Sequence, residues 1–396
     1  MKEIRVAIID VVSVVVYEFI NVLFVYKYTS RVISHAWVAS LFYLIILSLF
    51  IWILFQIKDF RLSLKTQNVL YFSMVALLAI GLAFLMFHFD PHKIRVGRYL
   101  ALDDWIARFF NGEFPYASHT YPSGFPFLFV MAMPFYFLGD LGFFQIFSFL
   151  VFAALIYLRH RQTSMNRFRC IFLLITAPLF LYEIVVRSDL FSNMVMVMLY
   201  LAILELYEPR VNHLTLGLLG IIGGFLLSTR GIVLLIYIPF FGYLFFTKGK
   251  STFGRKGLII KSGLFLLSLL FGFSLSLMPL AIWGWKQFIS FGSFSIQLSY
   301  APNWLLILSV VCSFSSVLII KSLKGIYSAI SFLLFGVIGI ALVKALFNYG
   351  WYKTIVGDGF DISYFSFALP FLIISLDFLN KGTTSVTTGV FLSEPN

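Results

Sequence analysis

The sequence predicts an all-α membrane protein, a polytopic bundle of about 12–13 transmembrane helices. The first observation is composition: 61% of the residues are hydrophobic and 12% are charged, whereas a soluble domain is roughly 45–50% apolar and about 25% charged. The second is that apolar runs of spanning length recur along the whole chain, with no strand pattern between them. Such a chain cannot bury all its apolar groups in one aqueous core, so lipid must cover many of them.

The predicted spans form a single membrane domain over residues 1–380. Within it, residues 1–66 contain two spans, residues 67–140 contain a third span, a long loop and a short helix, and residues 141–380 contain the remaining spans. The tail 381–396 is polar, and we expect it to be flexible. The apolar runs cover residues 6–26, 36–57, 69–88, 141–158, 170–186, 190–207, 214–229, 231–247, 258–282, 304–320, 326–346 and 361–379.

Lysine and arginine set the orientation, because short loops on the cytoplasmic side of a membrane are enriched in them. One set of loops, together with the N-terminus, holds 18 of the 29 basic residues, and we assign it to the cytoplasm. The other loops then face the opposite side: 27–35, 89–124, 187–189, 230, 283–303 and 347–361. This topology accounts for the net charge of +12, so nucleic acid is not expected as a partner. The basic set is Lys2, Arg5, Lys58, Arg61, Lys65, Arg159, Arg161, Arg167, Arg169, Arg210, Lys248, Lys250, Arg255, Lys256, Lys261, Lys321, Lys324 and Lys381.

One apolar segment, Gly124 to Leu138, does not fit this alternation. It is short and contains Pro126 and Pro134. A full crossing there would move the arginine-rich loop 159–169 to the outside. We therefore interpret the segment as a re-entrant or half-buried helix, which is tolerated where protein or a water-filled cavity surrounds it. The alternative is a complete crossing that breaks the positive-inside rule once.

The outer loop from Phe89 to Ser123 carries ten ionisable residues and is far longer than a connector needs to be, which suggests function. Its centre predicts an amphipathic helix that lies flat at the membrane surface. Asp104 and Arg108 form an i,i+4 pair of opposite charge, and Asn111-Gly112 is a stop signal. The apolar side of this helix consists of Tyr99, Leu102, Trp105, Ile106 and Phe109.

Three carboxylates in this loop are candidates for chemistry. Asp90 directly follows the third span at the lipid–water boundary and precedes Pro91. It is either an ordinary acid at a helix end or a functional group. Asp103 and Asp104 are interpreted first as solvated charges on a helix face, with catalysis as the alternative.

A second group of charges lies between apolar runs on the same side. Arg187, Asp189 and Arg230 sit where two runs join almost without a loop. Charges near lipid are costly, so they usually face a cavity or a partner. Either Arg187 pairs with Asp189 and Arg230 snorkels, or the guanidinium groups form a phosphate site. Further polar residues facing this compartment are Lys286, Gln297, Lys353, Asp358 and Asp361.

The run from Asp90 to Gly139 resembles the C-type (GT-C) integral-membrane glycosyltransferases. The resemblance rests on an acidic residue just after a span, an amphipathic loop helix, a Gly-x-x-Pro-Tyr turn and a Tyr-Pro entry into an apolar helix. About an eighth of the chain carries it, and the two spans in 1–66 are an addition to the family pattern. The turn is Gly112-Glu113-Phe114-Pro115-Tyr116, and the entry is Tyr121-Pro122-Ser123-Gly124-Phe125-Pro126.

The resemblance implies transfer of a sugar, mannose by default, from a polyprenyl-phosphate donor to a lipid-, glycan- or protein-linked acceptor. The reaction would occur with inversion on the extracytoplasmic face of the cell membrane. Asp90 would be the general base, with Asp103 and Asp104 as the remaining catalytic candidates. Asp90 with His92 or Asp103 could ligate a divalent metal, although nothing in the sequence requires one. Substrate and phosphate contacts would come from Arg98, Arg187, Asp189, Arg230, Lys286, Lys353, Tyr116 and Tyr121.

Three other functions are compatible with a multi-span chain. A transporter or lipid flippase would use the same buried charges, but it often has paired repeats, and no repeat is evident here. A polymerase or ligase of surface polysaccharide usually has its large loop late in the chain, whereas this loop comes early. A structural scaffold would not need ten ionisable groups in one outer loop.

Overall fold

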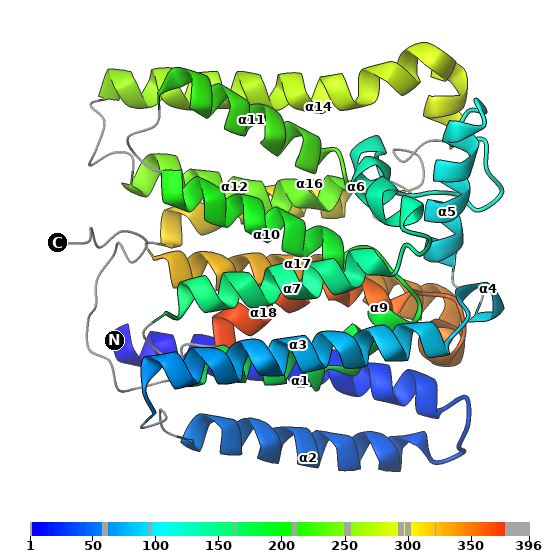
Figure 1. The fold of residues 1–396 in the computed structure, drawn as a ribbon, viewed down its shortest axis with the longest axis vertical. Helices are drawn as coiled ribbons and strands as arrows, with labels where there is room; N and C mark the ends of the chain where they lie inside the picture. The colour runs from blue at the N-terminus through cyan, green and yellow to red at the C-terminus, as the bar shows by residue number, and fades with distance from the viewer. Residues whose placement is uncertain are drawn as a thin grey trace.

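The computed structural model of the chain is a bundle of helices, most of which run side by side (Figure 1). It describes residues 2–57, 62–94, 97–161, 164–207, 212–248, 255–291, 297, 302–320 and 322–376. Throughout these ranges, every regular element is helical, so the predicted all-α class is confirmed. The predicted tail 381–396 lies outside the described residues, as do several of the basic residues used for orientation, such as Lys58 and Arg210.

Most of the helices overlap the predicted apolar runs, and two of them lie in the predicted outer loop. Short 3₁₀ or π-helical turns (η) extend several of them. The elements are α1 (Lys2–Thr29), α2 (Ala36–Gln56), α3 (Leu64–His88), α4 (Pro91–Ile94), α5 (Gly97–Phe110), α6 (Pro126–Phe137), α7 (Phe143–Arg159), α8 (Ser164–Ile175), α9 (Pro178–Val185), α10 (Leu190–Tyr207), α11 (His213–Leu227), η1 (Gly231–Val233), α12 (Leu234–Gly242), η2 (Tyr243–Lys248), α14 (Arg255–Phe291), α16 (Asn303–Ile319), α17 (Leu323–Trp351), η3 (Tyr352–Val356), η4 (Ile362–Phe367) and α18 (Leu369–Leu376).

Five of the described helices are long and apolar enough to cross a membrane, and a sixth span results if the bent pair α8–α9 is counted as one. The prediction of about 12–13 spans is higher, because it counted apolar runs rather than helix lengths. Several of those runs form helices of only 10–17 residues. The five long helices comprise Ile8–Thr29, Ala36–Gln56, Leu64–His88, Lys256–Ser290 and Leu323–Val356.

The segment 124–138 forms the 12-residue helix α6. At 1.5 Å per residue this helix is about 18 Å long, whereas the hydrocarbon core of a bilayer is about 30 Å thick. Its length therefore favours the half-buried interpretation over a complete crossing. Pro126 occupies its first turn, where the missing N–H costs no hydrogen bond.

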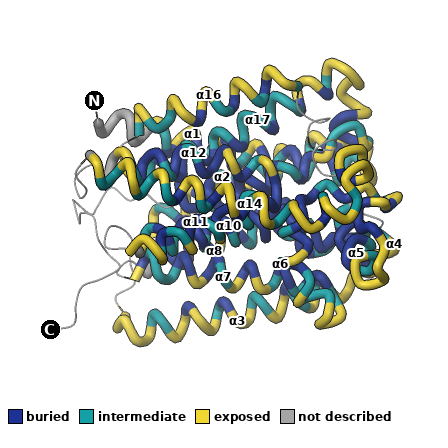
Figure 2. The backbone as a smooth tube through the Cα atoms, turned by 90° about the horizontal axis from the view of Figure 1, so that it is seen from above, coloured by how far each residue is buried: buried dark blue, intermediate teal, exposed yellow. Residues whose placement is uncertain are grey.

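Apolar side chains are exposed along the outer helices, whereas the central ones are buried on most sides. Exposed residues follow α3 and α16 at two edges of the bundle, and buried residues gather around α7 and α10 (Figure 2). Phe84 on α3 and Leu318 on α16 are 75% and 83% exposed. Exposing apolar surface of this extent to water is unfavourable, so the pattern supports a chain whose outer helices contact lipid.

Helices α11 and α14 form a pair at one side of the bundle (Figure 1) and approach each other through glycine. A Cβ atom at Gly224 would overlap the backbone of Leu269 and Phe273 in α14. A Cβ atom at Gly217, on the same helix, would only touch the Ser268 hydroxyl at 3.5 Å. Small residues allow this close packing, which is a common means of associating helices in lipid.

We expect Gly224→Ala to separate α11 from α14 and to lower the free energy of unfolding by about 1–3 kcal/mol. The added methyl group meets backbone atoms, which cannot rotate away. Thermal unfolding of the detergent-solubilised protein measures the effect. Gly217→Ala is the matched control and should leave the midpoint nearly unchanged. Equal midpoints for the two variants would contradict the proposed contact.

Helix α5 lies across one end of the bundle, next to α4 and α6 (Figure 1). It ends as predicted, since Gly112 has a φ of +74°, a conformation that glycine adopts without strain. Trp105 is fully buried and stacks on Phe129 of α6 with ring centroids 4.3 Å apart. The buried side of α5 thus contacts protein. Whether the helix also lies flat on a membrane stays a prediction.

Candidate functional site

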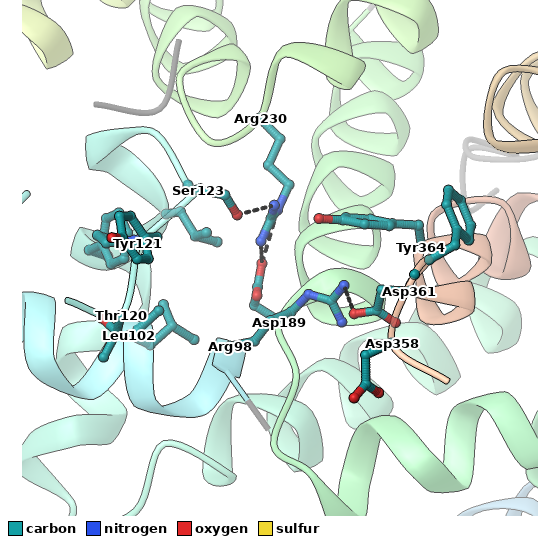
Figure 3. A pocket seen from close by; sticks show the side chains of 17 residues that line it. Arg98, Leu102, Thr120, Tyr121, Ser123, Asp189, Arg230, Asp358, Asp361 and Tyr364 are labelled. Carbon is teal, nitrogen blue, oxygen red and sulfur yellow. Dashed lines mark hydrogen bonds and ion pairs between the residues drawn. The ribbon is translucent and has the colours of Figure 1, made fainter. Parts of the chain in front are cut away.

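A polar pocket opens at the end of the bundle that carries α5. Its volume is about 290 Å³. Its wall combines segments that are far apart in the sequence: α5, the loop before α6, the residues before α10 and η1, and the loop before η4 (Figure 3). The lining residues are Arg98, Ala101, Leu102, Thr120, Tyr121, Pro122, Ser123, Gly124, Leu128, Phe129, Asp189, Arg230, Asp358, Gly359, Phe360, Asp361 and Tyr364.

Arg98 and Asp361 form the first of two ion pairs in this wall. The Arg98 Nη2 atom lies 2.6 Å from Asp361 Oδ2, and its Nη1 atom donates to the Ser363 hydroxyl at 2.5 Å. The guanidinium also lies 4.7 Å from the centre of the Tyr364 ring. Burial alone would raise the pKa of Asp361, but Arg98 and the hydrogen bonds from Ser363 outweigh it and lower that pKa. Asp361 therefore remains a carboxylate at neutral pH.

Arg230 and Asp189 form the second ion pair, and both side chains are buried. Asp189 Oδ2 accepts from Arg230 Nη2 at 2.5 Å and from Nε at 3.0 Å. The remaining nitrogen, Nη1, makes only a long 3.4 Å contact to the Ser123 hydroxyl. The pair thus fixes one edge of the guanidinium and directs the other toward the pocket, as Figure 3 shows.

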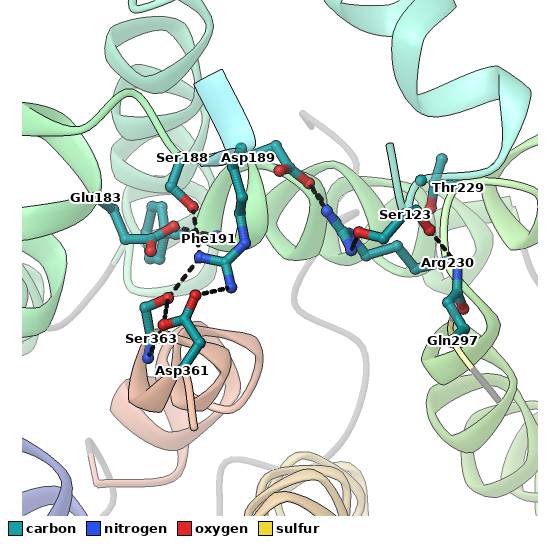
Figure 4. A network of polar contacts seen from close by, with 12 residues as sticks. Ser123, Glu183, Ser188, Asp189, Phe191, Thr229, Arg230, Gln297, Asp361 and Ser363 are labelled. Atoms are coloured by element: carbon teal, nitrogen blue, oxygen red, sulfur yellow. Dashed lines mark hydrogen bonds and ion pairs between the residues drawn. The ribbon is translucent and has the colours of Figure 1, made fainter. Parts of the chain in front are cut away.

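The loop before α6 is held against the Arg230 turn. The Phe125 amide donates to the Thr229 carbonyl at 2.9 Å. Gln297 bridges the two segments, since its amide nitrogen donates to the Ser123 carbonyl at 2.6 Å and its oxygen accepts from the Gly231 amide at 3.0 Å (Figure 4). These bonds position Ser123 and Arg230 on the same wall.

Tyr121 projects from this loop with a φ of +50°, which is rare for a bulky residue. It is 67% exposed and lines the pocket mouth. Such backbone strain persists only where the surroundings fix it. In this loop the following Pro122 and the bridge at Ser123 supply that constraint.

An apolar groove of about 390 Å³ begins where the polar pocket ends. The pocket and the groove have Ser123, Arg230, Phe360 and Tyr364 in common. From there the groove runs among α12, α16 and α17, and its walls are mainly aliphatic. The remaining lining residues are Phe125, Gly231, Ile232, Leu234, Leu235, Gln297, Leu306, Ser309, Val310, Val337, Ile338, Ala341 and Phe367.

Of the two interpretations of these charges, the one in which Arg187 pairs with Asp189 is wrong. Arg187 is 3% exposed and pairs with Asp140, whose carboxylate accepts from Nε at 2.8 Å. Its other nitrogens donate to the carbonyls of Phe89 and Met86 at 3.0 and 3.1 Å. Arg187 therefore binds carbonyls at the end of α3, and it does not line the pocket. The Met86 carbonyl also accepts from the Phe89 amide. Arg230 does not snorkel either, because Asp189 pairs with it.

None of the three predicted catalytic acids is among the residues that line the pocket. Asp90 is exposed, accepts from the His92 amide at 3.0 Å and lies 4.0 Å from Lys93. Asp104 accepts a hydrogen bond from Ser118 and lies 3.4 Å from Arg108, which confirms the predicted i,i+4 pair. Asp103 is half-buried, and burial raises its pKa.

Three more predicted contacts also lie outside the pocket lining. Lys286 is exposed on α14, and Lys353 is exposed with its ammonium 5.2 Å from the Tyr349 ring centre. Tyr116 is buried, and its hydroxyl donates to the Gly124 carbonyl at 2.8 Å. Of the predicted site residues, the pocket brings together Arg98, Tyr121, Asp189 and Arg230.

Sequence reasoning missed Asp140, Ser363, Tyr364 and Glu183 as parts of this end of the bundle. For Asp361 the sequence does contain a local signal of helix capping. Its carboxylate accepts from the Ser363 amide at 3.0 Å and so caps η4 in an Asp-x-Ser pattern.

Among the described residues, no group of three or more His, Cys, Asp or Glu side chains could hold a metal ion.

No known protein family, curated protein or solved structure matches the chain. The fold and the site therefore define its class by themselves. It is an all-helical membrane protein with at least five apolar helices of spanning length among its described residues. A pocket with two buried arginine–carboxylate pairs adjoins an apolar groove at one end of its bundle.

Proposed function

We propose that the protein is a membrane glycosyltransferase that moves a sugar from a polyprenyl-phosphate donor to a lipid-, glycan- or protein-linked acceptor. One observation carries the proposal: the polar pocket and the apolar groove meet at Arg230. A ligand that joins an anionic head to a long apolar chain matches this arrangement. The sugar would occupy the polar pocket, and the chain would lie in the groove and continue into lipid.

The arginine pairs support the role of a phosphate site. A guanidinium binds phosphate oxygens through paired N–H groups, and carboxylates hold the two guanidinium groups in fixed orientations. When the acceptor hydroxyl attacks the anomeric carbon, the bond to the lipid phosphate breaks and negative charge grows on the departing oxygen. Arg230 and Arg98 would stabilise that charge.

The acceptor proton needs a carboxylate that lines the pocket. The pocket is lined by Asp189 and Asp361, which are bound to arginines, and by Asp358, whose side chain is fully exposed and lies 3.5 Å from Arg31. Asp358 is the least constrained of the three. We therefore assign it the role of general base in the proposed reaction, in place of Asp90.

The direct test is incubation of the purified protein in lipid with radiolabelled polyprenyl-phosphate sugars and a panel of lipid, glycan and peptide acceptors. The radiolabel should move to one acceptor class. Polyprenyl-phosphate mannose is the first donor to test. Absence of transfer from every donor, with the folded protein present, would overturn the proposed activity.

We expect Asp358→Asn to reduce the transfer rate by about 10²–10⁴-fold, the usual contribution of a general base. The asparagine keeps the shape of the side chain but cannot accept the proton. The matched control is Glu113→Gln, which alters an exposed carboxylate that pairs with Arg108 outside the pocket. Asp90→Asn is measured in parallel, and loss of transfer there with full transfer in Asp358→Asn would return the role to Asp90.

A transporter of lipid-linked anions is the second candidate function. Helices α8 and α9 are bent by 63° at a short break, and broken helices of this kind surround the substrate sites of many transporters. Movement of a labelled prenyl phosphate across the membrane of proteoliposomes, without sugar transfer, would favour this function over the first.

A further inference from the structure

Glu183 is a buried carboxyl group without a cation of its own. It lies on α9, is 0% exposed, and one of its oxygens accepts from the Phe191 amide at 3.3 Å. The Ser188 side chain also interacts with this carboxyl group, whereas its Oε1 atom accepts no hydrogen bond among the described residues. Figure 4 places Glu183 beside Ser188 and Phe191, next to the two ion pairs of the pocket. An ionisable residue in such a setting normally has a functional reason.

The charged groups around Glu183 are already paired with other residues. Arg98 of α5 is the cation that attracts the Glu183 carboxylate electrostatically, but its guanidinium forms an ion pair with Asp361 at 2.6 Å. Asp189, ahead of α10, carries like charge and is bound to Arg230. From α1, Tyr28 packs on Tyr182 of α9 with ring centroids 5.1 Å apart. Arg187, one turn beyond Glu183, is bound to Asp140.

Counting charges gives the consequence. Arg98 and Arg230 are paired with Asp361 and Asp189, and the third carboxylate of the pocket wall, Asp358, is paired with Arg31, so these three pairs are neutral together. Lys27 adds one buried positive charge that acts on Asp361, and an ionised Glu183 would offset it. An anionic ligand at Arg98 and Arg230 would then leave an excess negative charge close to Glu183. Negative charges at low dielectric repel, so a bound anion favours the form of Glu183 that carries a proton.

The surroundings also contain polar atoms that a protonated carboxyl group or a water molecule could satisfy. The Gln145 amide nitrogen donates to the Ser188 carbonyl at 2.7 Å, while its oxygen has no partner in the described part of the chain. Buried polar groups are rarely left this way, so a shared proton or water fits the unpaired oxygens of Glu183 and Gln145.

We infer that Glu183 is a proton-binding site coupled to the anion site formed by Arg98 and Arg230, so that the anionic head binds together with a proton. The inference rests on the proposed function for the position of the head group. The sign of the coupling is fixed: raising the pH removes the proton from free Glu183 and therefore weakens anion binding. Reciprocally, the bound anion strengthens proton binding by the same factor.

The probe must keep its own charge constant, because a phosphate monoester titrates near neutral pH. We choose a farnesyl methyl phosphodiester, which carries one negative charge across the range. Its affinity for the full chain in lipid nanodiscs is measured between about pH 5 and pH 9. In the wild type, affinity should fall as pH rises, by up to about tenfold per pH unit if one proton is coupled.

Glu183→Gln should bind the probe with an affinity that hardly changes with pH and, at the alkaline end, at least about tenfold more tightly than the wild type. Glu113→Gln, which changes an exposed carboxylate outside the pocket, should keep the wild-type slope. A second measurement needs no variant: binding to the wild type in weak buffer near neutral pH should take up as much as about one proton per probe molecule.

The outcomes separate the two proposals. Binding without pH dependence and without proton uptake overturns the role of Glu183, whether or not sugar transfer occurs. A slope that survives in Glu183→Gln also overturns it. Proton-linked binding without sugar transfer supports the role of Glu183 and contradicts the proposed glycosyltransferase activity. Absence of probe binding at every pH overturns both.

Discussion

Replacing Arg230 by glutamine is expected to abolish binding of a prenyl phosphodiester. Arg230 is the charged residue shared by the polar pocket and the apolar groove, and its free edge faces the place where head and chain of the ligand would join. Loss of a charge-assisted contact of this kind weakens binding by at least about tenfold to a hundredfold. Equilibrium binding of the phosphodiester to nanodisc-embedded protein measures the effect.

This variant also leaves Asp189 buried without a partner, which costs about 3–5 kcal/mol of stability. The double variant Arg230→Gln with Asp189→Asn removes both charges and retains hydrogen-bonding groups. We expect it to recover most of the lost stability while binding remains absent. If the double variant bound the phosphodiester as the wild type does, Arg230 would have no part in ligand binding.

Arg187→Ala is expected to destabilise the protein by about 3–5 kcal/mol without removing a ligand contact. The change removes the guanidinium that donates to the carbonyls of Phe89 and Met86, and it leaves the Asp140 carboxylate without its countercharge. Thermal unfolding in detergent should show the loss. Below the unfolding transition, the variant should still bind the prenyl phosphodiester.

Asp140→Asn is the companion to this variant. It keeps a hydrogen-bond acceptor beside Arg187 but removes the compensating charge, so we expect a smaller loss of stability. A contrary result is clear: an Arg187→Ala protein of normal stability that no longer binds the phosphodiester would make Arg187 a ligand residue, as the sequence first suggested.

The positions of the helices were predictable because each apolar run is a local signal. Gly112 ends α5, and Tyr99, Leu102, Trp105 and Ile106 form its buried side, as their spacing indicated. The number of spans was less predictable. A run of 15 apolar residues looks like a span in sequence, yet as a helix such as α11 it is only about 22 Å long.

Several residues of the site could be predicted from the sequence, but which acid pairs with which arginine could not. Asp189 and Arg230 were identified because charges at the ends of apolar runs are unusual, and Arg98 because it belongs to the charged outer loop. Which acid meets which arginine depends on tertiary contacts: Arg98 pairs with a residue 263 positions away, and Arg187 with one 47 positions away. No local pattern encodes such distances, so the nearest acid in the sequence, Asp189, was the wrong partner for Arg187.

The long separation between Arg98 and Asp361 has a consequence for biogenesis. A ribosome adds 263 residues after Arg98 before its carboxylate partner exists. Until then, the growing protein must accommodate a lone guanidinium, either in water at the membrane surface or on a chaperone. The pocket can therefore assemble only after residue 361 has been synthesised. A nascent chain released before residue 361 would expose an unmatched positive charge, which quality-control proteases could recognise.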